Sequence, residues 1–127
     1  MRLTSAYFAN HADVVDGMLN VTGAYWSSTA VSPGAGGFKC YVVVACELDP
    51  QDVGRQYTLH VDAQGPTGQR WAPVQSTSFT VNGPMLFMCS PMVLPVEFSG
   101  GRHVYTFRLD GQHERVDVPI DVRLTPA

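Results

Sequence analysis

The chain has 127 residues, of which 45% are apolar and 15% are charged, and its formal net charge is −3. This length suits one domain, residues 1–127, built around a single hydrophobic core. Globular proteins carry about 25% charged residues on average, so this surface is unusually sparse in charge. No run of basic residues occurs, which argues against a nucleic-acid partner. Sparse charge also leaves surface that a protein partner can cover.

Membrane contact is not expected either. The roughly 20 consecutive apolar residues that span a bilayer are not found, because Pro91 and Pro95 interrupt the most apolar stretch. The opening residues alternate between apolar and polar types and lack the apolar segment of a secretory signal. We therefore expect a cytoplasmic protein.

The three cysteines fit a reducing compartment, because an odd number cannot pair completely within one chain. Cys40 and Cys46 lie six residues apart on one expected strand, which is about 20 Å and too far for a disulfide. Reduced thiols in the core are the simplest expectation. The sequence leaves open whether Cys89 pairs with Cys40 or Cys46.

The first strands are joined by a tight turn at Asp16-Gly17. Two-residue hairpin turns favour this dipeptide because both residues tolerate positive φ. Leu19, Val21 and Tyr25 then alternate into the core. A single helical turn around 11–15 is the alternative for the residues just before the turn.

Period-two alternation of apolar and polar residues continues along the rest of the chain and indicates strands. The stretch "FKCYVVVACEL" predicts a long central strand, and "QYTLHVDA" and "RVDVPIDVRL" predict strands with one apolar face. Pro119 lacks a backbone N–H, so the last strand should lie at an edge or carry a bulge. The expected strands cover residues 2–10, 18–31, 38–48, 56–64, 76–82, 85–98, 103–110 and 114–124, with 85–98 read as one bent strand or two short ones.

Seven or eight short, mostly antiparallel strands must pack as two sheets or close on themselves. We predict an all-β fold, an immunoglobulin-like β-sandwich. A small β-barrel is the alternative. The Cys…Trp…Cys spacing of antibody domains is absent, so the likeness concerns architecture.

The opening "AYFANHADVVDGMLNVTGAYW" resembles the start of a family of small bacterial proteins described only as a domain of unknown function. In that family an "aD…dGklnilGgg" pattern follows the first strand, and Asp16, Gly17, Leu19, Val21 and Gly23 match it. The later "YTLHVDAQGPTGQ" and "VYTFRLDG…VPIDV" are similar to the family's middle and end. Met18 departs from the pattern, where the family tends to have Lys. The resemblance implies a β-sandwich and brings no activity, cofactor or catalytic residue.

Acidic residues in the expected loops are the candidates for a metal site. If the strands run alternately up and down, the connections near 10–17, 49–55, 82–84 and 110–113 meet at one end of the sandwich. Ca²⁺ binds about 6–8 oxygen ligands, and these loops carry five candidate aspartates: Asp13, Asp16, Asp49, Asp52 and Asp110. Asp is also a preferred turn residue, which explains the same pattern without a metal.

Two smaller groups of polar residues have similar alternatives. His60 and Asp62 share the outer face of one expected strand and would hold a metal only with a third ligand from a neighbour; a solvated polar face is the simpler explanation. His11 lies near Asp13 and Asp16 in the sequence, and we expect it to be solvated.

The methionine-rich stretch 85–98 is the candidate partner surface. Its two faces are both apolar, so it is either a central strand with a bent continuation or an adaptable contact surface. The predicted contact residues are Met85, Phe87, Met88, Met92 and Trp71.

No catalytic signature is present: the sequence contains no G-x-S-x-G, C-x-x-C or H-E-x-x-H motif. The sequence therefore predicts a non-enzymatic module that binds a protein or itself, without a cofactor. One alternative is a calcium- or small-ligand-binding module that uses the acidic loops. The other is a structural subunit of a larger particle, such as a phage virion or a secretion apparatus.

Overall fold

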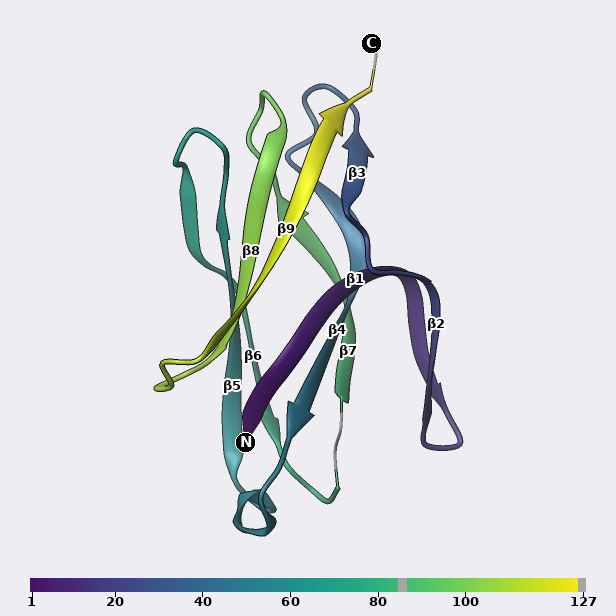
Figure 1. The fold of residues 1–127 in the computed structure, drawn as a ribbon, viewed down its shortest axis with the longest axis vertical. Coiled ribbons are helices and arrows are strands. Elements are labelled where there is room, and N and C mark those ends of the chain that lie inside the picture. Colours follow the sequence, from purple (N-terminus) through teal and green to yellow (C-terminus); the bar gives the residue numbers. More distant parts are fainter. Residues whose placement is uncertain (85–86, 126–127) are drawn as a thin grey trace.

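The computed structural model describes residues 1–84 and 87–125, which form two β-sheets and a short 3-10 turn at Pro50–Asp52 (Figure 1). Sheet A has the strand order β2-β1-β4-β7, and sheet B has the order β3-β9-β8-β5-β6. The strands are β1 (Arg2–Val15), β2 (Met18–Ala24), β3 (Ser28–Val31), β4 (Gly37–Glu47), β5 (Gln56–Gln64), β6 (Arg70–Thr80), β7 (Phe87–Pro95), β8 (Gly101–Leu109) and β9 (Arg115–Leu124). The all-β sandwich is thereby confirmed, and the barrel is set aside because the sheets do not close.

The connections between the sheets follow the immunoglobulin pattern. The chain passes from β4 in sheet A to β5 in sheet B, and again from β7 to β8, while β4 and β7 are neighbours. Strands β4 and β7 thus correspond to strands B and E of immunoglobulin domains, and β5, β8 and β9 correspond to their C–F–G sheet. Only β3 and β9 pair in parallel among the described strands, and their register begins at Asp121. The expectation that the last strand lies at an edge or carries a bulge is wrong, because β9 lies between β3 and β8 and its register with β8 is unbroken. Pro119 is tolerated because it lies before the paired part of β3 and pairs with Val104 of β8.

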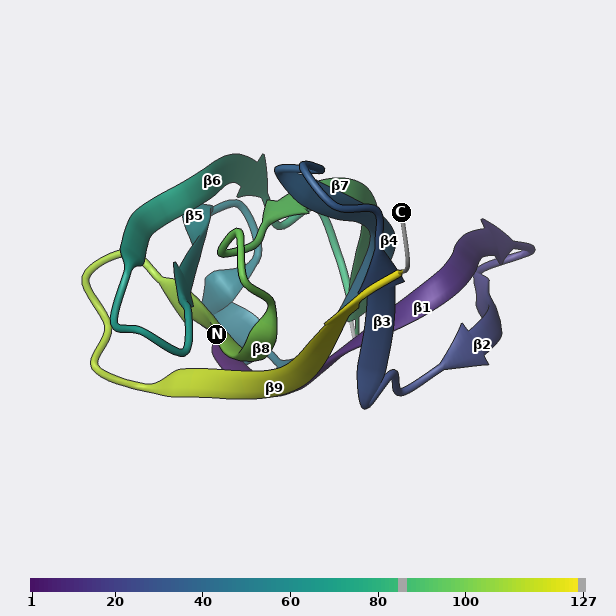
Figure 2. The ribbon, with the colours of Figure 1, turned by 90° about the horizontal axis from the view of Figure 1, so that it is seen from above.

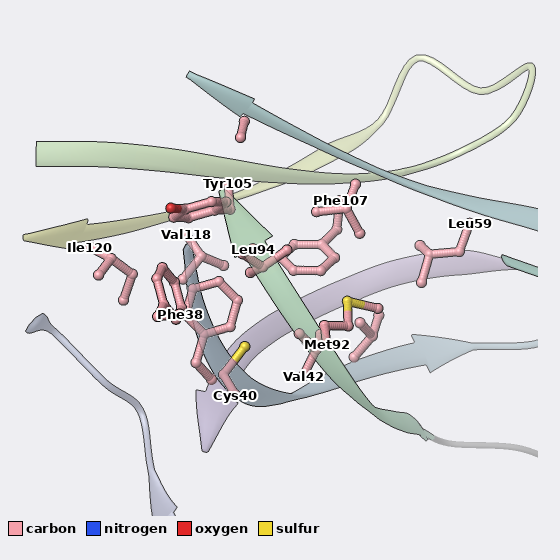
Figure 3. Packing of buried hydrophobic residues seen from close by; sticks show 14 of the residues in the cluster. Phe38, Cys40, Val42, Leu59, Met92, Leu94, Tyr105, Phe107, Val118 and Ile120 are labelled. Carbon is pink, nitrogen blue, oxygen red and sulfur yellow. The ribbon is translucent and has the colours of Figure 1, made fainter. Parts of the chain in front are cut away.

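Aromatic side chains join the two sheets at the centre of the core. Phe8 of β1 contacts Tyr105 and Phe107 of β8 edge to face, with ring centroids 5.5 and 6.2 Å apart. Edge-to-face contacts of this kind stabilise the fold beyond the free energy gained by burying the rings. Around them, the inward side chains of β4 and β7 meet those of β5, β8 and β9 (Figure 3): Phe38, Cys40, Val42, Met92 and Leu94 face Leu59, Tyr105, Phe107, Val118 and Ile120.

Several strand boundaries differ from those expected. The predicted strand 18–31 is divided into β2 and β3, because Gly23 and Tyr25 both have positive φ, 62° and 59°, and turn the chain from sheet A to sheet B. Residues 11–15 continue β1 and form no helical turn. Strand β6 begins at Arg70, six residues earlier than expected. Strand β7 is a single strand over Phe87–Pro95.

The hairpin at Asp16-Gly17 has the predicted turn, with φ of 52° and 74° at its two residues. Strand β1 changes partner along its length: Arg2–Ala9 pair with β4, whereas Ala9–Val15 pair with β2. Residues 10–24 therefore form a two-stranded ribbon, here called the arm. Figures 1 and 2 show the arm projecting from the side of the sandwich.

Candidate interaction surface

The outer face of sheet B is polar and its charges are internally paired. Asp62 accepts hydrogen bonds from Nε and Nη2 of Arg108, at 2.8 and 3.3 Å. The hydroxyl of Thr106 donates to Asp117 at 2.6 Å. His60 lies 2.7 Å from the hydroxyl of Ser76 through Nδ1 and 3.0 Å from Asp110 through Nε2. Most polar groups on this face thus bond to one another, and its apolar members include Val104, which pairs in register with Pro119.

The outer face of sheet A has the opposite character. Register places Tyr7, Val43 and Cys89 side by side across β1, β4 and β7, on the face turned away from the core. Val43 is 1% exposed although it lies outside the core cluster, so its own neighbours on this face cover it. The same face includes Ala9, Tyr41, Ala45, Phe87, Pro91 and Val93, with Lys39 as the cation of β4 on it.

Tyr25 extends this apolar face at the base of the arm. Its ring stacks on Tyr7 with centroids 4.1 Å apart, yet 70% of the residue remains exposed. A positive φ at a non-glycine residue costs free energy and persists only where the surroundings enforce it. The strained Tyr25 therefore holds an aromatic ring in place on the surface.

The tip of the arm is also apolar. Val14, Val15 and Met18, which flank the turn, are 51%, 50% and 65% exposed. Val93 of β7, on the outer face of sheet A, is 60% exposed. Most of the exposed large apolar side chains thus lie on the arm, beside it or on the outer face of sheet A, whereas Phe98, Val53 and Leu124 are exposed elsewhere.

A shallow groove of about 430 Å³ lies where β1 departs from β4. It is lined by Asn10 at the base of the arm, by Lys39 and Tyr41 of β4, by Pro91 and Val93 of β7 and by Gln75 of β6, with Cys40 and Met92 also contributing. Lys39 is the charged residue of this lining, which mixes polar side chains such as Asn10 and Gln75 with apolar ones.

The structure does not bring the five candidate aspartates together. Arg2 pairs with Glu47, so the turn with Asp49 and Asp52 lies beside the beginning of β1. Asp13 and Asp16 lie on the arm, beyond the point where β1 leaves β4 (Figure 2). The expected acidic end is therefore wrong with respect to the 10–17 connection, because β1 continues as a projecting ribbon and does not turn back at residue 10.

Asp52 is buried and has protein partners. Its Oδ2 accepts hydrogen bonds from the α-amino group of Met1 at 2.7 Å and from the N–H of Asp49 at 2.8 Å, and Tyr57 donates its hydroxyl to Oδ1. The bond from the amino group, followed by that from Tyr57, holds the pKa of Asp52 far below its usual range. Asp52 therefore fastens the 3-10 turn to β1 and β5.

The remaining metal candidates are engaged as well. Asp110 contacts His60, and Asp62 pairs with Arg108, so His60 and Asp62 have different protein partners. His11 is exposed and lies 4.0 Å from Asp13. No group of three or more His, Cys, Asp or Glu side chains with metal-binding geometry occurs within residues 1–84 and 87–125.

The methionine-rich stretch is oriented differently from the predicted contact surface. Met92 faces the core and is 6% exposed, and Met88 and Trp71 pack partly against the core, so these residues offer little contact area. Phe87 lies on the outer face of sheet A. Met85 falls outside the described residues. Several exposed apolar residues were not predicted, among them Val93, whose signal was its alternation with Met92 and Leu94. Tyr25, expected in the core, is 70% exposed.

The sheet itself separates the cysteines. Cys40 and Cys46 face the core, whereas Cys89 pairs in register with Val43 on the outer face, so a bridge to Cys89 would have to cross sheet A. Burial raises the pKa of Cys40 to about 12. Burial, and secondarily the charge of Asp13, raises the pKa of Cys89. A thiol with a raised pKa is a poor nucleophile at neutral pH.

A buried polar cluster at the far end of β7 was not anticipated from the sequence. The Glu97 carboxylate accepts bonds from the hydroxyl and N–H of Thr67 and from the N–H of Gln69. The N–H of Glu97 donates to Nε2 of His103 at 2.8 Å, so Nδ1 carries the proton and donates to the carbonyl of Gly101. Every polar group here has a partner, which indicates a structural clamp between the β5–β6 and β7–β8 connections.

A scan against protein-family models found no matching family, and a search of curated proteins found no match. The resemblance to the bacterial family of unknown function therefore stays a prediction. Across the part of the chain that the structure describes, no helix is long and apolar enough to cross a membrane.

Proposed function

We propose that this protein is a non-catalytic protein-binding and assembly module that uses the outer face of sheet A and the arm as its contact surface. The observation that carries the proposal is the contrast between the two outer faces. Sheet B covers its outer face with paired polar groups, such as Asp62 with Arg108, whereas sheet A presents Tyr25 and Val93 largely exposed. Contiguous exposed apolar surface is typical of interaction sites.

The chemistry of the side chains on this surface supports the same proposal. Aromatic residues are enriched and charged residues depleted at the centres of protein interfaces. Tyr7, Tyr25 and Tyr41 lie on or beside the outer face of sheet A, and Lys39 is the charged residue that β4 contributes to it. The rigid stack of Tyr7 on Tyr25 lowers the entropy that binding would otherwise cost.

The calcium alternative finds less support in the geometry. Ca²⁺ requires several convergent oxygen ligands, but Asp52 is bonded to Met1 and Tyr57 and Asp16 lies at the tip of the arm. The enzymatic alternative finds little support in the thiols, since the pKa values of Cys40, Cys46 and Cys89 are all raised.

Site-specific photo-crosslinking in the native host tests the proposal. A photoreactive amino acid replaces Val93 or Met18 on the proposed surface, and a matched variant carries it at Val53, which is 51% exposed but lies on the β4–β5 connection. We expect protein adducts from positions 93 and 18 and none from position 53, detected by gel shift and identified by mass spectrometry. Equal yields at all three positions, or no adduct from positions 93 and 18, would contradict the proposal.

A further inference from the structure

The edge of the arm differs from the other sheet edges of this protein. The described residues form four edge strands: β2 and β7 in sheet A, β3 and β6 in sheet B. Unpaired edges invite pairing with another chain, and proteins blunt them with proline, charge or short length. Strand β7 contains Pro91 and Pro95, β6 contains Pro73 and begins with Arg70, and β3 has four residues. Three edges are therefore protected in recognisable ways.

Strand β2 lacks these protections. Its seven residues, "MLNVTGA", include no proline and no charged side chain. In a hairpin closed by the two-residue turn Asp16-Gly17, Val15 and Met18 exchange backbone hydrogen bonds, so alternate residues point the other way. Leu19 and Val21 therefore direct their N–H and C=O groups to the free edge. The edge is open and chemically able to accept another strand.

The arm packs on the sandwich near its base, where the His11 ring lies 4.7 Å from that of Tyr41 and Ala12 is buried, but no third strand joins it among the described residues. A two-stranded hairpin is marginally stable in water unless a third strand or a packing surface joins it. Pairing of β1 with β4 ends at Ala9, so both long edges of the ribbon beyond that residue are unpaired in the described chain. Adding a strand to β2 would supply the third strand.

We infer that the occupant of this edge is the β2 strand of a second copy of this chain, paired antiparallel across a two-fold axis. An antiparallel pair of identical strands is isologous, so one open edge satisfies the other. Identical charged strands repel each other when they pair, because like charges then face one another. Strand β2 carries no charge, so its own copy can approach without this repulsion. The dimer would join two copies of sheet A into one continuous sheet. This inference rests on the proposed function and names its partner at the arm.

Light scattering coupled to size-exclusion chromatography, over a range of concentrations of purified protein, tests the inference. We expect a dimer for the unmodified chain and a monomer for Val21→Pro, which removes an outward N–H while leaving the bonds to β1 intact. The dissociation constant should rise about 30-fold, because the symmetric pair loses two backbone hydrogen bonds. The control Val21→Thr keeps the N–H and the β-branched shape, and should remain a dimer.

A second pair of variants keeps the test decisive if Val21→Pro disturbs the arm itself. Asn20→Lys and Asn20→Asp each place like charges across the axis, so each alone should be monomeric, and an equimolar mixture should recover the dimer. A monomeric unmodified protein, or a dimer that Val21→Pro and both Asn20 variants leave intact, would overturn the inference. Photo-crosslinks from Val93 to a different protein would in that case still support the proposed function, so the two failures are distinguishable.

Discussion

The hydroxyl of Tyr105, on β8, donates a hydrogen bond of 2.7 Å to the backbone carbonyl of Pro95, at the end of β7. The ring of Tyr105 lies in the centre of the core, where it contacts Phe8 and Phe38. One side chain thus fills the space between the sheets and fixes the corner at which the chain crosses from sheet A to sheet B. The contact resembles the tyrosine corner of immunoglobulin domains, where a tyrosine at the start of strand F bonds to upstream backbone.

Tyr105→Phe should therefore destabilise the protein without changing its fold. The substitution removes the hydroxyl and leaves the partly buried Pro95 carbonyl without this donor, which costs about 1–3 kcal/mol. Urea denaturation monitored by tryptophan fluorescence measures the loss in the free energy of unfolding. Tyr25→Phe is the control, because that ring is on the surface; an equal loss in both variants would contradict the role assigned to the corner.

Gly65→Ala should destabilise the clamp around Glu97. A Cβ atom at position 65 would lie 2.3 Å from Cγ and Cδ of Glu97, and that carboxylate is held in place by Thr67 and Gln69. Overpacking of this kind costs about 1–3 kcal/mol. Gly36→Ala is the matched control, since a Cβ there meets nothing within 4 Å. Thermal denaturation should show a lower midpoint for Gly65→Ala alone.

Stability should decrease at acidic pH partly through Glu97. The hydroxyl of Thr67, assisted by the N–H groups of Thr67 and Gln69, lowers the pKa of Glu97 in the folded protein against the opposing effect of burial. A carboxyl whose folded pKa is lowered stabilises the fold above its unfolded pKa of about 4.3, and this contribution is lost as the pH falls through the folded value.

Urea denaturation between pH 2 and pH 7 measures this dependence. Glu97→Gln should lower the free energy of unfolding at pH 7 and make its decline below about pH 4 less steep. Glu114→Gln, at an exposed position, should leave the profile almost unchanged. If the free energy of unfolding of Glu97→Gln changed with pH in parallel with that of the unmodified protein, the ionised Glu97 carboxylate would not contribute to the pH dependence of stability.

Truncation of two neighbouring side chains of β7 should change the stability of the protein by very different amounts. Met92→Ala empties part of the core and should cost about 2–5 kcal/mol, because Met92 faces the core cluster. Val93→Ala removes two methyl groups from an exposed side chain and should change stability by less than about 0.5 kcal/mol. Chemical denaturation of both variants checks the assignment, and similar losses would mean that β7 is turned differently.

The cysteines should differ in their reactivity toward alkylating reagents according to the face of sheet A on which they lie. Cys89 is half-buried on the outer face, whereas Cys40 is buried and its pKa is raised to about 12. Iodoacetamide at pH 8 should therefore modify Cys89 in the native protein and Cys40 only after unfolding, as read by peptide mass spectrometry. Cys89→Ser provides the baseline for the native state. Rapid modification of Cys40 in that variant would show that the core opens readily.

The stretch 85–98 illustrates how far the sequence alone can show which side chains of a strand face the core. Both faces of this stretch are apolar, and alternation alone could not show which face turns toward the core. The structure pairs Met92 with Cys40 and Val93 with Lys39, and that register assigns the methionine to the core and the valine to the surface. In "QYTLHVDA" only one face is apolar, and the predicted inward residues Leu59, Val61 and Ala63 are indeed buried.

The positions of the candidate metal ligands could not be predicted for a different reason. Turn residues identify where the chain reverses, but not which reversals meet in space. Asp16-Gly17 was correctly predicted as a hairpin turn, yet the hairpin projects from the sandwich and carries Asp13 and Asp16 away from Asp52. The length of β1, which changes its partner at Ala9, decided this, and alternation over 2–10 did not indicate the extension.

The sequence by itself determined the all-β class, the sandwich, the hairpin dipeptide and most of the core, because alternation and turn chemistry are local properties. Only the tertiary structure decided which apolar face stays uncovered, which edge strand stays open and which carboxylates are engaged. These depend on contacts between segments far apart in the chain: the strand pairs Val43 with Cys89 and Arg2 with Glu47, and the loop contact of Thr67 with Glu97. Strand register and sheet order set such contacts, and no local pattern encodes them.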